Sequence, residues 1–189
     1  MHSSKYKANL LAGILSAIFS MVMIDSFAQS ELTTSQDQGS NVTSLTASLG
    51  DPLFVEQGRI TGQRVLAVSP PPQLEISFVA NTSITNRTGF VVNAINIGTI
   101  ISTLNDDGTF GGKGQGLLRT KGGDFASCTS QSVGKLASDG NIIVHGLTLW
   151  STSRSETSEL AFVNGVLGLF EFKIDREGNL SVREWQVGK

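Results

Sequence analysis

The sequence predicts an all-β domain, an antiparallel closed β-barrel of about eight strands, with a two-sheet β-sandwich as the alternative. Three observations favour this fold class. From Leu53 onward, short apolar stretches of period two are separated by turn residues, and no long stretch keeps a helical period. The turns recur at near-regular spacing, which is typical of a meander. A meander must protect its edge strands, and closure into a barrel removes both edges.

Turn sequences divide the domain into its predicted strands. Each of the clearest turns joins a glycine, which can take a positive φ, to an Asp or Asn that bonds the local backbone. These turns are Asn105-Asp106-Asp107-Gly108, Lys121-Gly122-Gly123-Asp124, Ser138-Asp139-Gly140-Asn141 and Arg176-Glu177-Gly178-Asn179, and Ser69-Pro70-Pro71-Pro72 is a further break. The predicted strands are 54–68, 74–85, 88–103, 109–119, 124–136, 141–152, 160–174 and 180–187. Residues 151–158 are expected to form a polar loop, with a helical turn at 155–162 as the alternative.

The N-terminal segment 1–28 is typical of a secretory signal. Basic residues precede an apolar run from Leu10 to Ile24, which is too short to span a bilayer comfortably. Ser26-Phe27-Ala28 then supplies the small residues that signal peptidase requires, which predicts a mature start at Gln29. An uncleaved membrane anchor is the alternative, and it is the only membrane contact expected.

Residues 29–52 are rich in Ser, Thr, Gln and Asn, which predicts a disordered polar linker before the barrel domain at 53–189. The protein is therefore expected to be secreted or to reside in the cell envelope.

Composition excludes several classes of function. Removal of the predicted signal takes Lys5 and Lys7 from 14 basic residues and Asp25 from 16 acidic ones, so 12 and 15 remain, without a basic block. Nucleic acid is excluded as a partner, because its backbone requires clustered Lys and Arg. One cysteine, Cys128, and one histidine, His145, remain, which excludes an intramolecular disulfide and a Cys/His zinc site. No metal and no cofactor is expected.

One predicted strand carries glycines at alternate positions. Gly112, Gly114 and Gly116 fall on one face, and Gln115 and Arg119 fall on the other. Such a row permits sharp coiling or close approach of another backbone, as a barrel requires. A phosphate-binding loop is not favoured, because no helix follows to receive the anion.

Polar residues in the strands are the candidates for a site. Glu171 lies between Phe170 and Phe172, which predicts a carboxylate at the barrel mouth or paired inside with Arg64, Arg119 or Arg154. Glu171, His145, Gln115 and Arg119 are the predicted ligand-binding residues. A structural ion pair and a hydrogen-bonded core histidine are the plainer interpretations of Glu171 and His145.

No catalytic set is predicted. Pairing around the turn at 138–141 places His145 opposite Ser132 or Gly134, so Cys128 lies about 13 to 20 Å from it, beyond the reach of a nucleophile and base. Cys128 is expected to behave as a small buried hydrophobe.

The order of landmarks resembles an uncharacterised family of small secreted or hypothetical microbial proteins, over about Val55 to Trp185. The residues that carry the resemblance are Gly58-Arg59-Ile60-Thr61-Gly62-Gln63-Arg64-Val65-Leu66, the row Gly112 to Gly116, Leu160-Ala161-Phe162-Val163-Asn164-Gly165-Val166, Phe170-Glu171 and Glu184-Trp185. The resemblance implies an architecture similar to the allene oxide cyclase and dirigent β-barrels. It implies no activity and transfers no catalytic residue.

Three classes of function remain open. The preferred prediction is a secreted, non-catalytic module that binds a small apolar ligand or a protein partner. The alternatives are a cyclase or isomerase similar to the allene oxide cyclases, acting on a lipid-like ligand, and a structural envelope protein whose barrel is filled by its own side chains.

Overall fold

The computed structural model describes residues 49–152 and 157–188, which hold eight β-strands and one short 3₁₀ helix. The strands are β1 (Phe54–Ala67), β2 (Gln73–Thr85), β3 (Val91–Leu104), β4 (Phe110–Thr120), β5 (Phe125–Leu136), β6 (Ile142–Thr152), β7 (Leu167–Ile174) and β8 (Asn179–Gln186). The predicted signal at 1–28 and nearly all of the predicted linker at 29–52 lie outside the described residues. Within those residues, no helix is long and apolar enough to cross a membrane.

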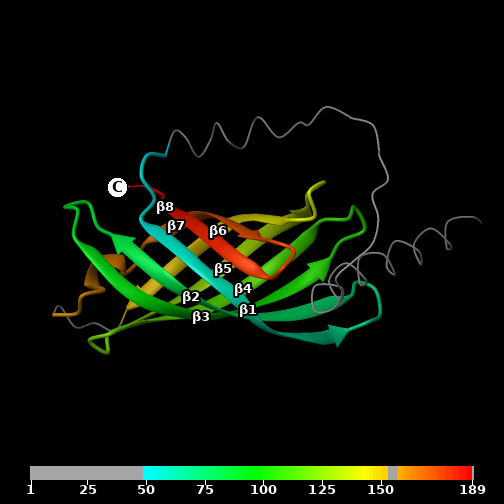
Figure 1. Cartoon of the computed structure of the whole chain (residues 1–189), viewed down its shortest axis with the longest axis horizontal. Helices are drawn as coiled ribbons and strands as arrows, with labels where there is room; N and C mark the ends of the chain where they lie inside the picture. Colours follow the sequence, from blue (N-terminus) through cyan, green and yellow to red (C-terminus); the bar gives the residue numbers. More distant parts are fainter. Residues whose placement is uncertain (1–48, 153–156, 189) are drawn as a thin grey trace, which may run out of the picture. The chain divides into compact units, whose positions relative to one another are not determined.

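The strands form a closed antiparallel barrel, so the predicted fold class is confirmed and the sandwich alternative is not. Each strand pairs with its neighbour in sequence, and β8 pairs with β1 to close the sheet, as Figure 1 shows. The strands are staggered around the barrel. When the paired residues are followed from Phe54 through β8 and on around the sheet to β2, the path returns to β1 at Val65 and not at Phe54. This stagger is the geometry that tilted strands need in order to close.

The turns are where the sequence predicts them. Gly108, Gly123, Gly140 and Gly178 have φ angles of 83°, 94°, 80° and 81°, values that side chains with a Cβ rarely adopt. Each of these four glycines therefore permits a tight connection between consecutive strands.

One predicted strand is wrong in its first half. The strand expected at 160–174 begins only at Leu167, and the 3₁₀ helix Ala161–Val163 precedes it. Leu160 and Val163 have no exposed surface, and Val166 is 5% exposed, because this segment folds into the apolar cluster at one end of the barrel. Residues 160–166 are called the plug below. The segment appears in orange at that end in Figure 1. An apolar run suits a strand or a plug equally, so its hydrophobicity alone does not distinguish the two.

The interior holds two apolar clusters. The first is at the plugged end of the barrel and contains Phe54, Ile84, Val92, Ala94, Leu118, Ala126 and Trp150 together with Leu160, Val163 and Val166 of the plug. The second contains Phe78, Ala80, Phe170, Phe172, Ile174, Leu180 and Val182. In the first cluster the rings of Phe54 and Trp150 stack with centroids 4.7 Å apart. Members of both clusters line one cavity, which is therefore the feature of the interior to consider for binding.

Candidate functional site

The cavity in the barrel has a volume of about 60 Å³ and a mixed lining. Aromatic and aliphatic side chains contribute to it, together with two carboxyls, an amide, a thiol and several hydroxyls. A volume of this size holds about four to six water molecules, or a ligand with a similar number of heavy atoms.

Two glutamates on neighbouring strands bring the carboxyls to the cavity. Glu56 lies on β1 and Glu184 on β8, and their side chains are only 4% and 5% exposed. The register pairs Phe54 with Glu184 and Glu56 with Val182, so the two glutamates are diagonal neighbours on the inner face of the sheet. Each belongs to the inward series of its strand, because strand side chains alternate between faces.

Glu184 is held by the indole of Trp150. Trp150 Nε1 donates a hydrogen bond to Glu184 Oε1 over 2.6 Å. A Cβ on Gly168, a diagonal neighbour on β7, would overlap the Glu184 carboxylate, so the glycine provides the space that this side chain occupies. Burial raises the pKa of Glu184 to about 8, the bond from Trp150 opposes the rise, and the charge of Glu56 adds to it.

Glu56 is held by the amide of Asn96. Asn96 Nδ2 donates to Glu56 Oε1 and Oε2, at 3.0 and 3.1 Å. Burial raises the pKa of Glu56 to about 7, and the hydrogen bond from Asn96 limits the rise. Asn96 Oδ1 has no hydrogen-bond partner, although the residue is only 5% exposed and lines the cavity. Buried polar atoms are almost always paired, so this oxygen marks an incomplete network.

The glycine row on β4 forms a wall of the cavity. A Cβ on Gly114 would meet Ser130 Oγ, and a Cβ on Gly116 would lie 3.0 Å from both Asn96 Oδ1 and Cys128 Sγ. Gly114, Gly116, Ser130 and Cys128 all line the cavity, and they are half-buried rather than buried. Because the half-buried side chains of Ser130 and Cys128 face the interior, solvent reaches this wall from inside the barrel.

Cys128 is not an activated nucleophile. Burial, together with the charges of Glu184 and Glu56, raises the pKa of its thiol to about 12, so the thiol stays protonated at neutral pH. The register places His145 opposite Val133, between the two partners that the sequence predicts. His145 belongs to the outward series of β6, whereas Cys128 lines the cavity, so the two do not form a dyad.

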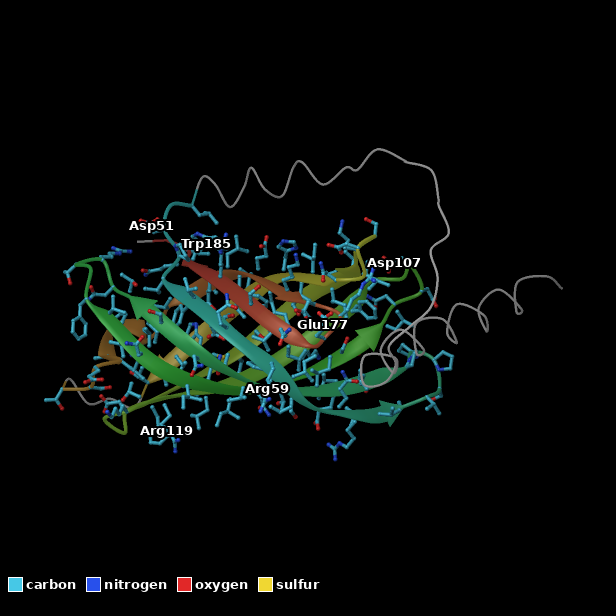
Figure 2. All side chains as sticks on the ribbon, in the orientation of Figure 1. Asp51, Arg59, Asp107, Arg119, Glu177 and Trp185 are labelled. Carbon is cyan, nitrogen blue, oxygen red and sulfur yellow. The ribbon has the colours of Figure 1, made fainter. Side chains whose placement is uncertain are left out.

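The predicted ligand-binding residues lie on the outer face of the barrel. Glu171 and His145 are brought together, with 3.5 Å between Glu171 Oε2 and His145 Nε2. Arg119 points away from the barrel (Figure 2), on β4, which β5 and β6 separate from the β7 strand of Glu171. Gln115 donates a hydrogen bond to Thr99 Oγ1 across the outer surface at 3.4 Å. Gln115 is also among the residues that line the cavity.

Glu56, Asn96 and Trp150 are not among the predicted site residues, and Glu184 is named only as part of the Glu184-Trp185 landmark. A signal for the glutamates is present, because each shares the alternation of apolar residues such as Phe54 and Val182 that fill the core. Among the described residues, no group of three His, Cys, Asp or Glu side chains is arranged to hold a metal ion.

Two solved structures resemble this barrel. A protein of unknown function from Clostridium acetobutylicum aligns over 73% of this chain and 98% of its own length, with a TM-score of 0.59 and 9% identity. A conserved protein of unknown function from Rhodopseudomonas palustris aligns over 73% and 95%, with a TM-score of 0.55 and 8% identity. No family model and no curated protein matches the sequence. At such low identity these similarities show the fold alone.

Proposed function

We propose that this protein is an exported, non-catalytic binding module that holds a small hydrogen-bonding ligand inside its barrel. The observation that carries the proposal is the cavity at Glu56, Asn96 and Glu184, where one buried amide oxygen has no partner. A ligand that donates to this oxygen would complete the network.

A barrel that served only as a structural element would not need this arrangement. Moving a carboxylate out of water costs several kcal/mol even after relaxation, and well-packed apolar side chains often replace buried ions without loss of stability. Glu56 and Glu184 are both about 95% buried, and no Lys, Arg or His lines the cavity among the residues described. A role in binding accounts for two buried acids better than the envelope-protein alternative does.

The cavity does not favour the alternative of a cyclase or isomerase similar to the allene oxide cyclases. A lipid-like substrate has many more heavy atoms than the four to six that about 60 Å³ accommodates. The buried carboxyls of Glu56 and Glu184 and the unpaired Asn96 Oδ1 likewise favour a ligand that carries hydrogen-bonding groups over the purely apolar one that the sequence predicts. Export rests on the signal-like segment 1–28, and N-terminal sequencing of the protein from its own host tests it: a start at Gln29 is expected.

Native mass spectrometry of protein from its own host tests the binding module. We expect a mass excess over the denatured protein, and we expect Ser130→Leu to abolish it, because this side chain fills the space beside Gly114. Thr129→Leu is the matched control, since Thr129 is the exposed neighbour on the outer face. A wild-type protein without a bound molecule would contradict the proposal, and a discrete oligomer in its place would favour a protein-interaction module.

A further inference from the structure

The hydrogen-bond inventory of the cavity indicates what the ligand must offer. The buried N–H donors that line the cavity are already used, since Trp150 Nε1 donates to Glu184 and Asn96 Nδ2 donates to Glu56. Hydroxyls of the lining, such as those of Ser130 and Ser132, can donate or accept. Asn96 Oδ1, which is unpaired, is an acceptor, and the carboxylates retain further lone pairs. A ligand that satisfies Asn96 Oδ1 therefore has to donate a hydrogen bond to it.

The charges of the cavity point the same way. Glu56, Glu184 and Cys128 are its titratable lining residues, and Cys128 stays a neutral thiol. Within the part of the chain that the structure describes, no basic side chain lines the cavity to balance the two acids. Buried carboxylates are stable only when they are paired, so a positive charge in the cavity would stabilise both ionised forms.

The apolar lining adds a third feature. Phe78, Phe170, Phe172 and Trp150 contribute aromatic rings to the cavity. Aromatic faces attract cations through the ring quadrupole, by about 0.5 to 2 kcal/mol. A metal ion lacks the ligand set it needs here, because the described residues contain no group of three suitable side chains.

We propose that the cavity binds a small organic cation with N–H donors, of the alkylammonium class, between Glu56 and Glu184. The inference rests on the proposed binding function and specifies its ligand. The ammonium donates to the two carboxylates and to Asn96 Oδ1, and its carbon atoms contact the aromatic rings. Because the pKa values of Glu56 and Glu184 are about 7 and about 8, binding near neutral pH releases protons that these carboxyls carry.

The two tryptophans provide a site-specific readout in the full chain. Trp150 Nε1 donates to Glu184 in the cavity, whereas Trp185 Nε1 donates to Gly50 O at 2.9 Å, on the outer face. Figure 2 labels Trp185 beside Asp51, where the described chain enters the barrel. Titration of ¹⁵N-labelled protein with ethylammonium chloride at pH 7 is expected to shift the Trp150 indole resonance and leave that of Trp185 unchanged.

Matched probes separate charge from shape. Ethanol has the heavy-atom shape of ethylammonium without its charge, sodium acetate reverses the charge, and potassium chloride matches the ionic strength. We expect ethylammonium to bind at least tenfold more tightly than ethanol, and Glu56→Gln or Glu184→Gln to weaken it at least tenfold. Calorimetry of the wild type in two buffers of different ionisation enthalpy is expected to show net proton release, a result that requires no variant to fold.

Each contrary outcome has a distinct meaning. Equal binding of ethanol, or absence of proton release, overturns the cationic ligand and leaves the binding module standing. An equal shift with potassium chloride overturns the organic cation in favour of a simple ion. If no probe moves the Trp150 resonance, the inference fails, and the proposed function fails with it only if native mass spectrometry also finds no bound molecule.

Discussion

Replacement of Glu184 by Gln is expected to remove most of the pH dependence of stability that this residue causes. The substitution keeps the shape of the side chain and an oxygen that accepts from Trp150 Nε1. It removes a carboxyl whose pKa burial raises from 4.5 to about 8. A carboxyl with a raised pKa in the folded protein stays protonated after the unfolded chain has ionised, so stability falls as pH rises through this window.

The magnitude follows from the pKa values. Below pH 4.5 the carboxyl is protonated in both states, and above about pH 8 it is ionised in both. Between these limits the free energy of unfolding falls by about 1.4 kcal/mol per pH unit, which gives about 4 kcal/mol between pH 5 and pH 8. Glu56, with a pKa of about 7, causes a further loss that overlaps this one, because its charge is one cause of the raised pKa of Glu184.

Urea unfolding followed by tryptophan fluorescence, in amine-free phosphate buffer at pH 5 and pH 8, measures the effect. The wild type is expected to be several kcal/mol less stable at pH 8, and Glu184→Gln to lose about 4 kcal/mol less between the two pH values. Glu177→Gln, at the exposed turn between β7 and β8 (Figure 2), is the control and is expected to behave like the wild type. A wild type that is equally stable at both pH values, or a Glu184→Gln variant with unchanged pH dependence, would refute the reasoning.

Three further predictions concern packing and reactivity. Gly168→Ala places a Cβ against the Glu184 carboxylate and is expected to lower the free energy of unfolding by about 1 to 3 kcal/mol, measured by urea unfolding. Gly62→Ala is the control, because its Cβ meets one atom at 3.9 Å, and it is not expected to destabilise the protein. Leu160→Ala in the plug is expected to lose about 2 to 5 kcal/mol in the same assay, and an unchanged midpoint would mean that the plug does not contribute to the core. Cys128, with a thiol pKa of about 12, is expected to react with iodoacetamide at pH 8 about a hundredfold or more slowly than a free thiol, and a rate like that of free cysteine would contradict this.

The plug shows where prediction from sequence reaches its limit within the fold. The turns at Gly108, Gly123, Gly140 and Gly178 follow from local chemistry, because only glycine takes a positive φ at low cost. Leu160 to Val166 is apolar in the same way as a strand, but it becomes a plug because the open barrel end needs an apolar cover. That need exists only after the eight strands have closed, so no local pattern reveals it.

The candidate site shows the same limit. Alternation places Glu56 and Glu184 on the inner faces of their strands. The sequence prediction instead favoured Glu171, which lies between two phenylalanines, with His145 and Arg119. The structure places His145, Glu171 and Arg119 outside, where one pair meets and the third residue stands apart.

The sequence by itself determined the all-β class, the positions of the turns and the row of small residues on β4, because these depend on single residues and on side-chain alternation. Only the tertiary structure decided that β8 meets β1, that Glu56 and Glu184 thereby become neighbours, and that the glycine row borders a cavity beside them. The reason is physical: the pKa of a carboxyl depends on what surrounds it, and residues 128 positions apart in the chain become neighbours only when the first and last strands pair.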